Sequence, residues 1–253
     1  MVQALQGGSL ESRVARLHEL LKAAPEGVTE DFERRFDMSW IYHDSALEGV
    51  VYTMDELQGA LLAEEPPTEA SLIPVYDEIR NHKAAIDMVR EMAQKKRFSI
   101  TLDIIKKLYA QLAPEELEGK AQPTYRKDMP LHRLYFHEIS PPEKISYRMR
   151  QLVQWMNAPE TKRSTHAVRL AARAHQQMLG IYPFPRQSGK VGRLIMNLIL
   201  LRHSYPPVVI HATQRQRYYD SLKQGEDAVS KLVNEALGAS LESTISYFED
   251  AVR

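Results

Sequence analysis

Cysteine is missing altogether from this 253-residue sequence, which excludes a disulfide framework and any cysteine-ligated metal site. No apolar run approaches the ~20 residues that a membrane-spanning helix needs. The first residues lack the basic start and apolar core of a secretory signal. An excess of one charge is missing too, because 33 basic residues balance 33 acidic ones. We therefore expect a cytoplasmic protein with neither a membrane nor a nucleic-acid partner.

Helical periodicity dominates the rest of the chain. With 43% hydrophobic and 26% charged residues, the composition is that of an ordinary globular protein. Apolar residues recur at helical spacing, and the sequence Thr53–Glu56 is a capping box. The predicted helices start near Ser9 or Ser12, after Thr29, at Thr53, near Glu69, at Thr101, after Pro142, at Ala167 and after the loop at 180–193, with three more toward the C-terminus. This pattern predicts an all-α fold.

Two stretches break the helical pattern. Within residues 119–142, a glycine and several prolines flank a run at 131–139 that contains aromatic residues. The aromatic content and rough alternation of this run are typical of a short β-hairpin. We expect this hairpin at 122–140, with His132 and His137 at its surface. The other break, at 64–67, is the expected boundary between an N-terminal helical region (1–65) and a core domain (66–253).

The stretch with the clearest chemical content is 180–193, which lies between two apolar helical runs. Pro183 and Pro185 cannot lie inside a helix, so the chain is predicted to form a helix, a tight loop and a second helix. Lys190 and Arg193 then fall in the first turn of the second helix, where free N–H groups and the helix dipole attract anions. Two cations there are unfavourable unless a phosphate or carboxylate lies beside them.

This loop resembles the signature of the Fic (Fido) domain family, His-Pro-Phe-x-Asp/Glu-Gly-Asn-Gly-Arg-x-x-Arg. Pro183, Phe184, Gly189 and Arg193 match it in register. A stretch before the loop, 165–175, and two stretches after it, 197–210 and 217–222, are similar to the family's sequence in the same order, and the resemblance covers about residues 30–253. It implies a Fic-like helical bundle with one small β-hairpin flap, framed by Tyr125-Arg126 and Pro141-Pro142, which would align a target protein at 122–140.

The departures from the signature bear on catalysis. In the family, the signature histidine deprotonates a target hydroxyl for AMP transfer from ATP, and the acidic residue holds Mg²⁺. Tyr182 stands at the histidine position, and a phenol with a pKa of about 10 is a poor base at neutral pH. Arg186 stands at the acidic position, where a cation would repel a metal but can pair with phosphate. We therefore expect no Mg²⁺ and weak or absent adenylyl transfer.

The same resemblance implies a nucleotide- or phosphate-binding set. Ser188, Gly189 and Lys190 fall where the family forms its anion hole, and Arg193 matches the arginine that grips the terminal phosphate. With Arg186 they form the expected binding residues, and ATP or another nucleotide is the expected ligand. His175, Tyr218 and Tyr219 are expected to be packed residues rather than catalytic ones.

A second resemblance lies in the N-terminal region. Residues 45–49, Ser-Ala-Leu-Glu-Gly, are similar to the family's autoinhibitory motif, Ser/Thr-x-x-x-Glu-Gly, with Asp44 at the Ser/Thr position. This implies that Glu48 pairs with Arg193 and occupies the place of a terminal phosphate. We expect a carboxylate oxygen of Glu48 within about 4 Å of the Arg193 guanidinium. The alternative is a solvated glutamate before a helix-capping Gly49.

Three functions remain open at this point. The first is a divergent Fic protein that binds nucleotide or phosphate with little or no adenylyl transfer. The second is an active transferase of altered chemistry that uses another phosphate-containing donor. The third is a non-catalytic, partner-binding domain. The loss of both the histidine and the acidic residue favours the first and third over the second.

Overall fold

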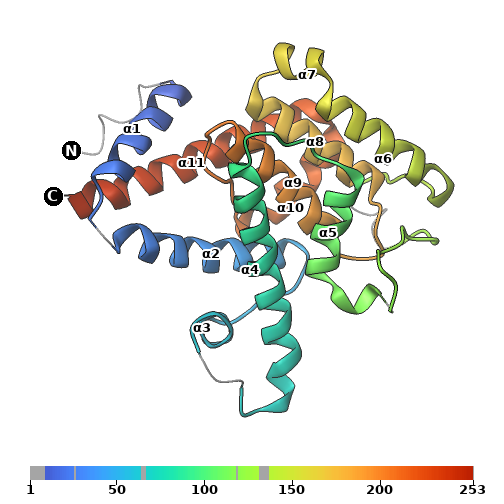
Figure 1. The fold of residues 1–253 in the computed structure, drawn as a ribbon, viewed down its shortest axis with the longest axis horizontal. Coiled ribbons are helices and arrows are strands. Elements are labelled where there is room, and N and C mark those ends of the chain that lie inside the picture. The colour runs from blue at the N-terminus through green and yellow to red at the C-terminus, as the bar shows by residue number, and fades with distance from the viewer. Residues whose placement is uncertain (1–8, 26, 64–66, 118, 131–136, 253) are drawn as a thin grey trace.

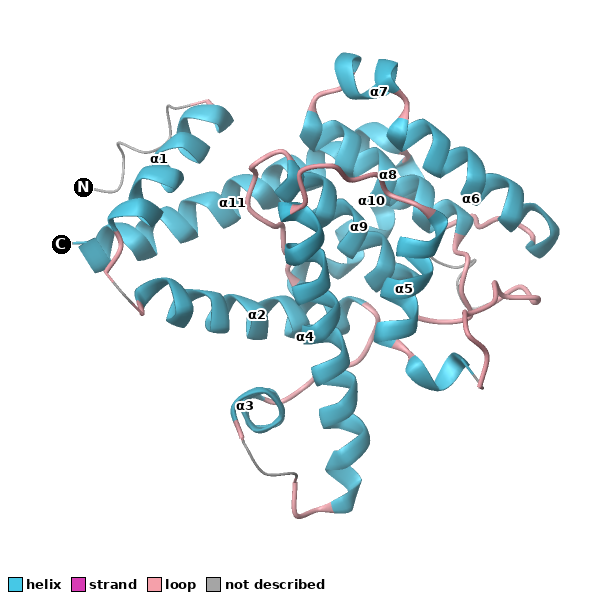
Figure 2. Ribbon diagram, viewed as in Figure 1, coloured by secondary structure: helices cyan, strands magenta, loops and turns pink. Residues whose placement is uncertain are grey.

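The structure, a computed structural model, describes residues 9–25, 27–63, 67–117, 119–130 and 137–252. All regular structure in these residues is helical (Figure 1; Figure 2). The α-helices are α1 (Leu10–Ala23), α2 (Val28–Leu47), α3 (Met54–Leu62), α4 (Ile73–Gln94), α5 (Leu102–Leu112), α6 (Pro142–Asn157), α7 (Pro159–Ser164), α8 (Ala167–Ile181), α9 (Ser188–Arg202), α10 (Arg215–Gln224) and α11 (Glu226–Val252). Short 3₁₀ helices are η1 (Ala70–Leu72), η2 (Pro114–Leu117) and η4 (Ala212–Gln214).

Hydroxyl side chains begin three of these helices as the sequence predicts. Ser9, Thr53 and Thr101 each accept a hydrogen bond from the backbone N–H three residues later. Thr53 and Glu56 also form the predicted capping box, because Glu56 Oε2 accepts from the backbone N–H of Thr53 at 2.7 Å. These bonds satisfy N–H groups that have no partner within the helix.

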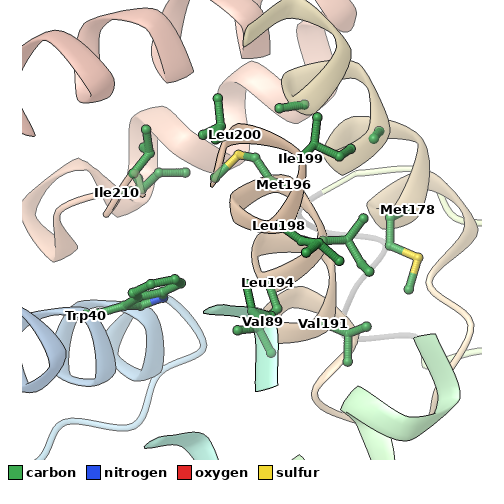
Figure 3. Packing of buried hydrophobic residues seen from close by; sticks show 14 of the residues in the cluster. Trp40, Val89, Met178, Val191, Leu194, Met196, Leu198, Ile199, Leu200 and Ile210 are labelled. Carbon is green, nitrogen blue, oxygen red and sulfur yellow. The ribbon is translucent and has the colours of Figure 1, made fainter. Parts of the chain in front are cut away.

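Helix α9 forms the centre of the core. Every residue from Ser188 to Leu200 is buried, and α4, α8 and α5 pack against it. Trp40 of α2, Val89 of α4 and Met178 of α8 surround its apolar side chains in Figure 3. A helix that is buried on all sides has no free face for solvent, so its polar residues must find partners within the protein.

The N-terminal helices attach to this body at different places. Helix α1 lies along α11, and α3 packs against the first half of α4 (Figure 1). Helix α2 carries the segment that reaches the N-terminal end of α9. The predicted boundary between residues 1–65 and 66–253 falls at 64–66, which lie outside the described residues, so this division stays a prediction.

The β-hairpin is not seen in the part of the chain that the structure describes. Residues 121–130 and 137–141 form no strand (Figure 2). The centre of the predicted hairpin, 131–136, lies outside the described residues, and so does His132. His137 was expected at the surface, but it is only 5% exposed. Its Nε2 lies 3.0 Å from the carbonyl of Leu179, one of the last α8 carbonyls that lack a partner within the helix.

Two helical details also differ from the sequence-based expectation. The short helix α7 was not predicted, because it has too few residues to show a period. The three helices predicted at the C-terminus are one 3₁₀ helix, η4, followed by α10 and the 27-residue α11. None of the described helices is both long and apolar enough to cross a bilayer.

Candidate functional site

The loop between α8 and α9 has a residue in the left-handed backbone conformation at each end. Tyr182 ends α8 with φ of 49°, and Gln187 begins α9 with φ of 59°. This conformation costs a residue other than glycine about 1–2 kcal/mol. Gln187 stands where the Fic signature has a glycine, which would adopt that φ without strain. The loop between the two residues is therefore tight and fixed at both ends.

Arg126 fastens the segment before α6 to this loop. Its guanidinium donates to the carbonyls of Tyr182 at 2.6 Å and Asp128 at 2.8 Å, and also to that of Ser140. Its backbone N–H donates to the carbonyl of Pro183 at 2.9 Å. A buried arginine with several carbonyl acceptors thus satisfies the end of α8, where helical carbonyls lack partners. Sequence reasoning placed Arg126 at the flap and missed this positioning role.

Arg193 lies at the centre of the site and is almost fully buried. Its Nη2 lies 2.9 Å from Glu48 Oε1, and its Nε donates to Asp44 Oδ1. Its Nη1 donates to the hydroxyl of Tyr218 at 3.0 Å. The predicted contact between Glu48 and Arg193 is therefore confirmed. Asp44 is a second partner that the sequence did not reveal, although it lies one helical turn before Glu48 on α2.

Glu48 reaches Arg193 because the end of α2 is anchored. The carbonyl of Leu47 accepts from the hydroxyl of Tyr219 and from Arg215 Nε, each at 3.0 Å. Gly49, with φ of 95°, turns the chain away from the helix, as a glycine after a helix end commonly does. The side chain of Glu48 is only 9% exposed, so the alternative of a solvated glutamate is wrong.

The carboxylate of Glu48 also rests on the first turn of α9. A Cβ atom built on Gly189 would overlap Glu48 Oε1 and lie 3.1 Å from Arg193 Nη1. A carboxylate at the start of a helix is attracted by the free N–H groups and the dipole there. The predicted anion site thus contains an anion, and that anion belongs to the protein itself.

Asp44 is buried together with its partners. Burial by itself would raise the pKa of its carboxyl, but the Arg193 guanidinium, helped by His82 and Lys190, lowers that pKa to about 2. His82 Nε2 lies 3.1 Å from Asp44 Oδ2. Burial lowers the pKa of His82, and although the contact with Asp44 opposes this, the cations Lys190 and Arg193 add to the lowering. Asp44 is therefore a carboxylate that neutralises Arg193 inside the protein.

Lys190 is paired with a residue that sequence reasoning missed. Its side chain is only 2% exposed, and its Nζ lies 3.2 Å from Glu78 Oε1. Glu78 comes from α4 and also accepts from Gln187 Nε2 at 3.3 Å. Burial would raise the pKa of Glu78, but Lys190 outweighs it and lowers that pKa. No signal in the sequence links residues 78 and 190, because their contact depends on the packing of α4 on α9.

Arg186 lies elsewhere than expected. Its guanidinium is half exposed and pairs with Glu115 and, at 2.9 Å, with Glu116. Both carboxylates belong to η2, which packs beside the loop. The structure therefore does not bring Arg186 into the buried group around Lys190 and Arg193. Its direct contact with phosphate stays a prediction that requires Arg186 to leave η2.

Ser188 and Tyr182 also take part in the structure of the loop. The Ser188 hydroxyl accepts from the backbone N–H of Phe184 at 2.9 Å and donates to its carbonyl at 3.1 Å. The Phe184 ring stacks on Tyr109 with ring centroids 3.9 Å apart. Tyr182, at the histidine position of the signature, is buried. Tyr182, Phe184 and Ser188 are thus enclosed by the fold, whereas Arg186 is not.

His175 is a packed residue, as expected. It is completely buried, and its Nε2 lies 3.0 Å from the Tyr218 hydroxyl. Burial, assisted by the charge of Arg193, lowers the pKa of His175 to about 3. Burial likewise raises the pKa of Tyr218. Both groups are neutral at physiological pH and connect α8 and α10 to Arg193.

Lowering the pH from 7 to 5 is expected to destabilise the fold by about 2 kcal/mol through His175 alone. The unfolded chain takes up a proton at the ordinary pKa of 6.5, whereas the folded chain does so only near about 3. The contribution of His175 to the free energy of unfolding is therefore fully present above pH 6.5, and it is lost as the pH falls from 6.5 toward about 3. Urea unfolding at both pH values checks this, with His175→Gln as the comparison. A variant whose stability falls as steeply as that of the wild type would contradict it.

Among the described residues, no three histidine, aspartate or glutamate side chains gather closely enough to hold a metal ion. The groups suited to a nucleotide are the two buried cations, Lys190 and Arg193, and the N–H groups at the start of α9. A cavity of about 810 Å³ is lined by α4, the end of α5, η2 and the loop residues Arg186 and Gln187, and its lining includes Glu78, the partner of Lys190. The site thus combines enclosed positive charge with an adjacent open volume.

Comparison with known proteins shows similarity to the Fic/DOC family. The model of the Fic/DOC family matches residues 99–200, which include the loop and most of α9. Protein adenylyltransferase Fic of Culex quinquefasciatus is 28% identical over 193 residues, which are 76% of this chain and 37% of that protein. Its counterpart in Drosophila melanogaster is 27% identical over 227 residues, 88% of this chain and 44% of that protein. The chain spans less than half the length of these curated relatives.

A solved structure shares the fold along nearly the whole chain. A Fic-domain-containing signaling protein from Bacteroides thetaiotaomicron superposes with a TM-score of 0.79 at 22% identity. The match covers 95% of this chain and 97% of that one.

Proposed function

This chain carries a Fic domain, and we propose that it binds a nucleotide or phosphate in the loop before α9 while transferring AMP weakly or not at all. The curated relatives are named protein adenylyltransferases, which supports adenylyl transfer as the ancestral chemistry of the site. The observation that carries the proposal is the position of the Glu48 carboxylate. A carboxylate already occupies the first turn of α9 and pairs with Arg193, so the site suits an anionic group of that size.

Weak transfer follows from the residue at the base position. Transfer of AMP requires a group that removes the proton from a target hydroxyl. Tyr182 stands at that position and is buried. His175, another buried candidate, touches Tyr218 rather than the loop surface and has its pKa lowered to about 3 by burial and by Arg193. We therefore propose a binding domain in which the chemical step is weak or absent.

Binding is expected to need no divalent metal. The position of the family's acidic residue holds Arg186, and Lys190 and Arg193 supply positive charge directly to an anion. Calorimetry with ATP, ADP and AMP, each with Mg²⁺ and with a chelator, measures this. Affinity should be unchanged by the chelator and should fall with rising salt. Lys190→Ala should weaken binding by about 1–3 kcal/mol, and binding that disappears with the chelator would contradict the proposal.

Incubation with labelled ATP and Mg²⁺ is expected to leave both this protein and added target proteins essentially unlabelled. The reason is the absence of the signature histidine and acidic residue, at Tyr182 and Arg186. The Tyr182→Phe variant should behave like the wild type. Robust labelling that Tyr182→Phe abolishes would instead favour an active transferase of altered chemistry. If neither labelling nor nucleotide binding is observed, the remaining hypothesis is a partner-binding domain. The segment at 122–140 is then the proposed contact with the partner.

A further inference from the structure

The anion site is closed at two points rather than one. Glu48 from α2 covers Arg193, and Glu78 from α4 covers Lys190. The two carboxylates come from different helices and meet different cations. Both cations are nearly fully buried, with side-chain exposures of 3% for Arg193 and 2% for Lys190. A buried cation requires an anionic partner. Removal of Glu78 would leave Lys190 to be paired by another anion, whereas removal of Glu48 would leave Arg193 with Asp44 and with its Nη2 position open to a second anion.

Glu78 has room to leave Lys190. Its side chain is 34% exposed, whereas that of Glu48 is 9% exposed. Glu78 lines the cavity of about 810 Å³ together with Gln187 and the exposed Asp77. The Gln187 amide, which donates to Glu78 at 3.3 Å, stands directly before the first turn of α9. Movement of Glu78 into this cavity would expose Lys190 without unpacking a helix.

We propose that Glu78 is a second occluding carboxylate, and that the site opens fully to a ligand with two linked anionic groups. One group replaces Glu48 on Arg193, and the other replaces Glu78 on Lys190. This inference rests on the proposed nucleotide or phosphate binding and specifies how that site is controlled. A ligand with a single anionic group can replace one carboxylate only, and the other cation keeps its glutamate.

Pyrophosphate binding tests the role of Glu78. Calorimetry at constant ionic strength compares the wild type with Glu78→Gln and with the matched control Asp77→Asn, which removes a charge from the same cavity. Glu78→Gln should raise the affinity by about tenfold or more, as expected when a hydrogen-bonded charge no longer competes. Asp77→Asn should change it less than about twofold, as for an exposed charge. Equal effects of the two substitutions would overturn the proposal.

A double substitution identifies the cation that is released. Glu48→Gln and Glu78→Gln should each raise pyrophosphate affinity, and the two factors should multiply in the combined variant because the carboxylates cover different cations. Adding Lys190→Gln to Glu78→Gln should abolish the gain from Glu78→Gln. A gain that survives Lys190→Gln would overturn the assignment of Glu78 to Lys190.

Two further controls separate the possible failures. Thermal unfolding checks that Glu78→Gln is folded. If it is not, Glu78→Asp, with its carboxylate withdrawn from Lys190, should show a smaller gain of the same sign, and no gain would overturn the proposal. A gain in pyrophosphate affinity in Glu48→Gln, without a gain in a folded Glu78→Gln, would refute only the assignment of Glu78 as a second occluding carboxylate. Absence of pyrophosphate and ATP binding in every variant would refute the proposed function and this inference together.

Discussion

Replacing Arg193 with methionine is expected to lower the free energy of unfolding by about 3–5 kcal/mol. Methionine fills much of the space of the arginine side chain, so the main loss is charge. Asp44 is 3% exposed in its side chain and would remain buried beside His82 without its cation. Glu48 would lose its contact with Arg193 as well. Urea unfolding at pH 7 measures the difference.

Arg217→Met is the matched control for this substitution. Arg217 pairs with Glu235, but both side chains are more than 40% exposed, so the same change should cost less than about 1 kcal/mol. Similar losses in the two variants would contradict the central role of the buried ion pair.

The pH dependence of the Arg193→Met variant provides an independent check. In the wild type, the pKa of Asp44 is lowered to about 2, chiefly by Arg193 acting against burial. Its contribution to stability is therefore present above the ordinary pKa of 3.8 and is lost as the pH falls toward about 2. Without Arg193, burial would raise the pKa of Asp44. Protonation of Asp44 at low pH would then remove the destabilising buried charge from the variant. The stability difference between the two proteins should therefore narrow as the pH falls below neutral.

Replacing Glu48 with glutamine is expected to raise the affinity for ATP by about ten- to hundredfold, because a bond to a charged partner contributes about 1.5–3 kcal/mol. Glutamine keeps the size of the side chain but loses its negative charge. It therefore competes less with a phosphate for Arg193 and for the N–H groups at the start of α9. Calorimetric titration of the wild type and the variant with ATP, in the presence of a chelator, gives the ratio of affinities.

Glu33→Gln is the control for Glu48. Glu33 lies on the same helix, α2, and is exposed, so its substitution should leave ATP affinity within about twofold. An unchanged affinity in Glu48→Gln, with Glu33→Gln also unchanged, would remove the autoinhibition hypothesis. The helical fold and the contact between Glu48 and Arg193 would not be affected by that result.

Local signals in the sequence predicted most of the helices. The caps at Ser9, Thr53 and Thr101 could be predicted because a cap depends on residues three positions apart. The loop at 180–193 could be predicted from its prolines, and the contact of Glu48 with Arg193 from the resemblance of two short motifs. In each case the information lies within a few residues or within a known pattern.

The other partners of the cations could not be predicted in the same way. Asp44 with Arg193 and Glu78 with Lys190 are contacts between residues more than 100 positions apart, and they depend on how α2 and α4 pack on α9. Arg186 was expected beside the other two cations because it is close to them in sequence. Its position is set instead by Glu115 and Glu116 on η2, a turn whose placement is a tertiary property.

Gly189 has a consequence for the evolution of this chain. A Cβ atom at this position would overlap the carboxylate of Glu48, so a substitution at 189 also disturbs residue 48. Positions 48 and 189 are therefore expected to covary among homologous sequences: lineages that retain the glutamate should retain the glycine, and larger residues at 189 should occur where the glutamate has been lost. The space for one methyl group at position 189 would thereby couple substitutions at the end of α2 to substitutions in the first turn of α9.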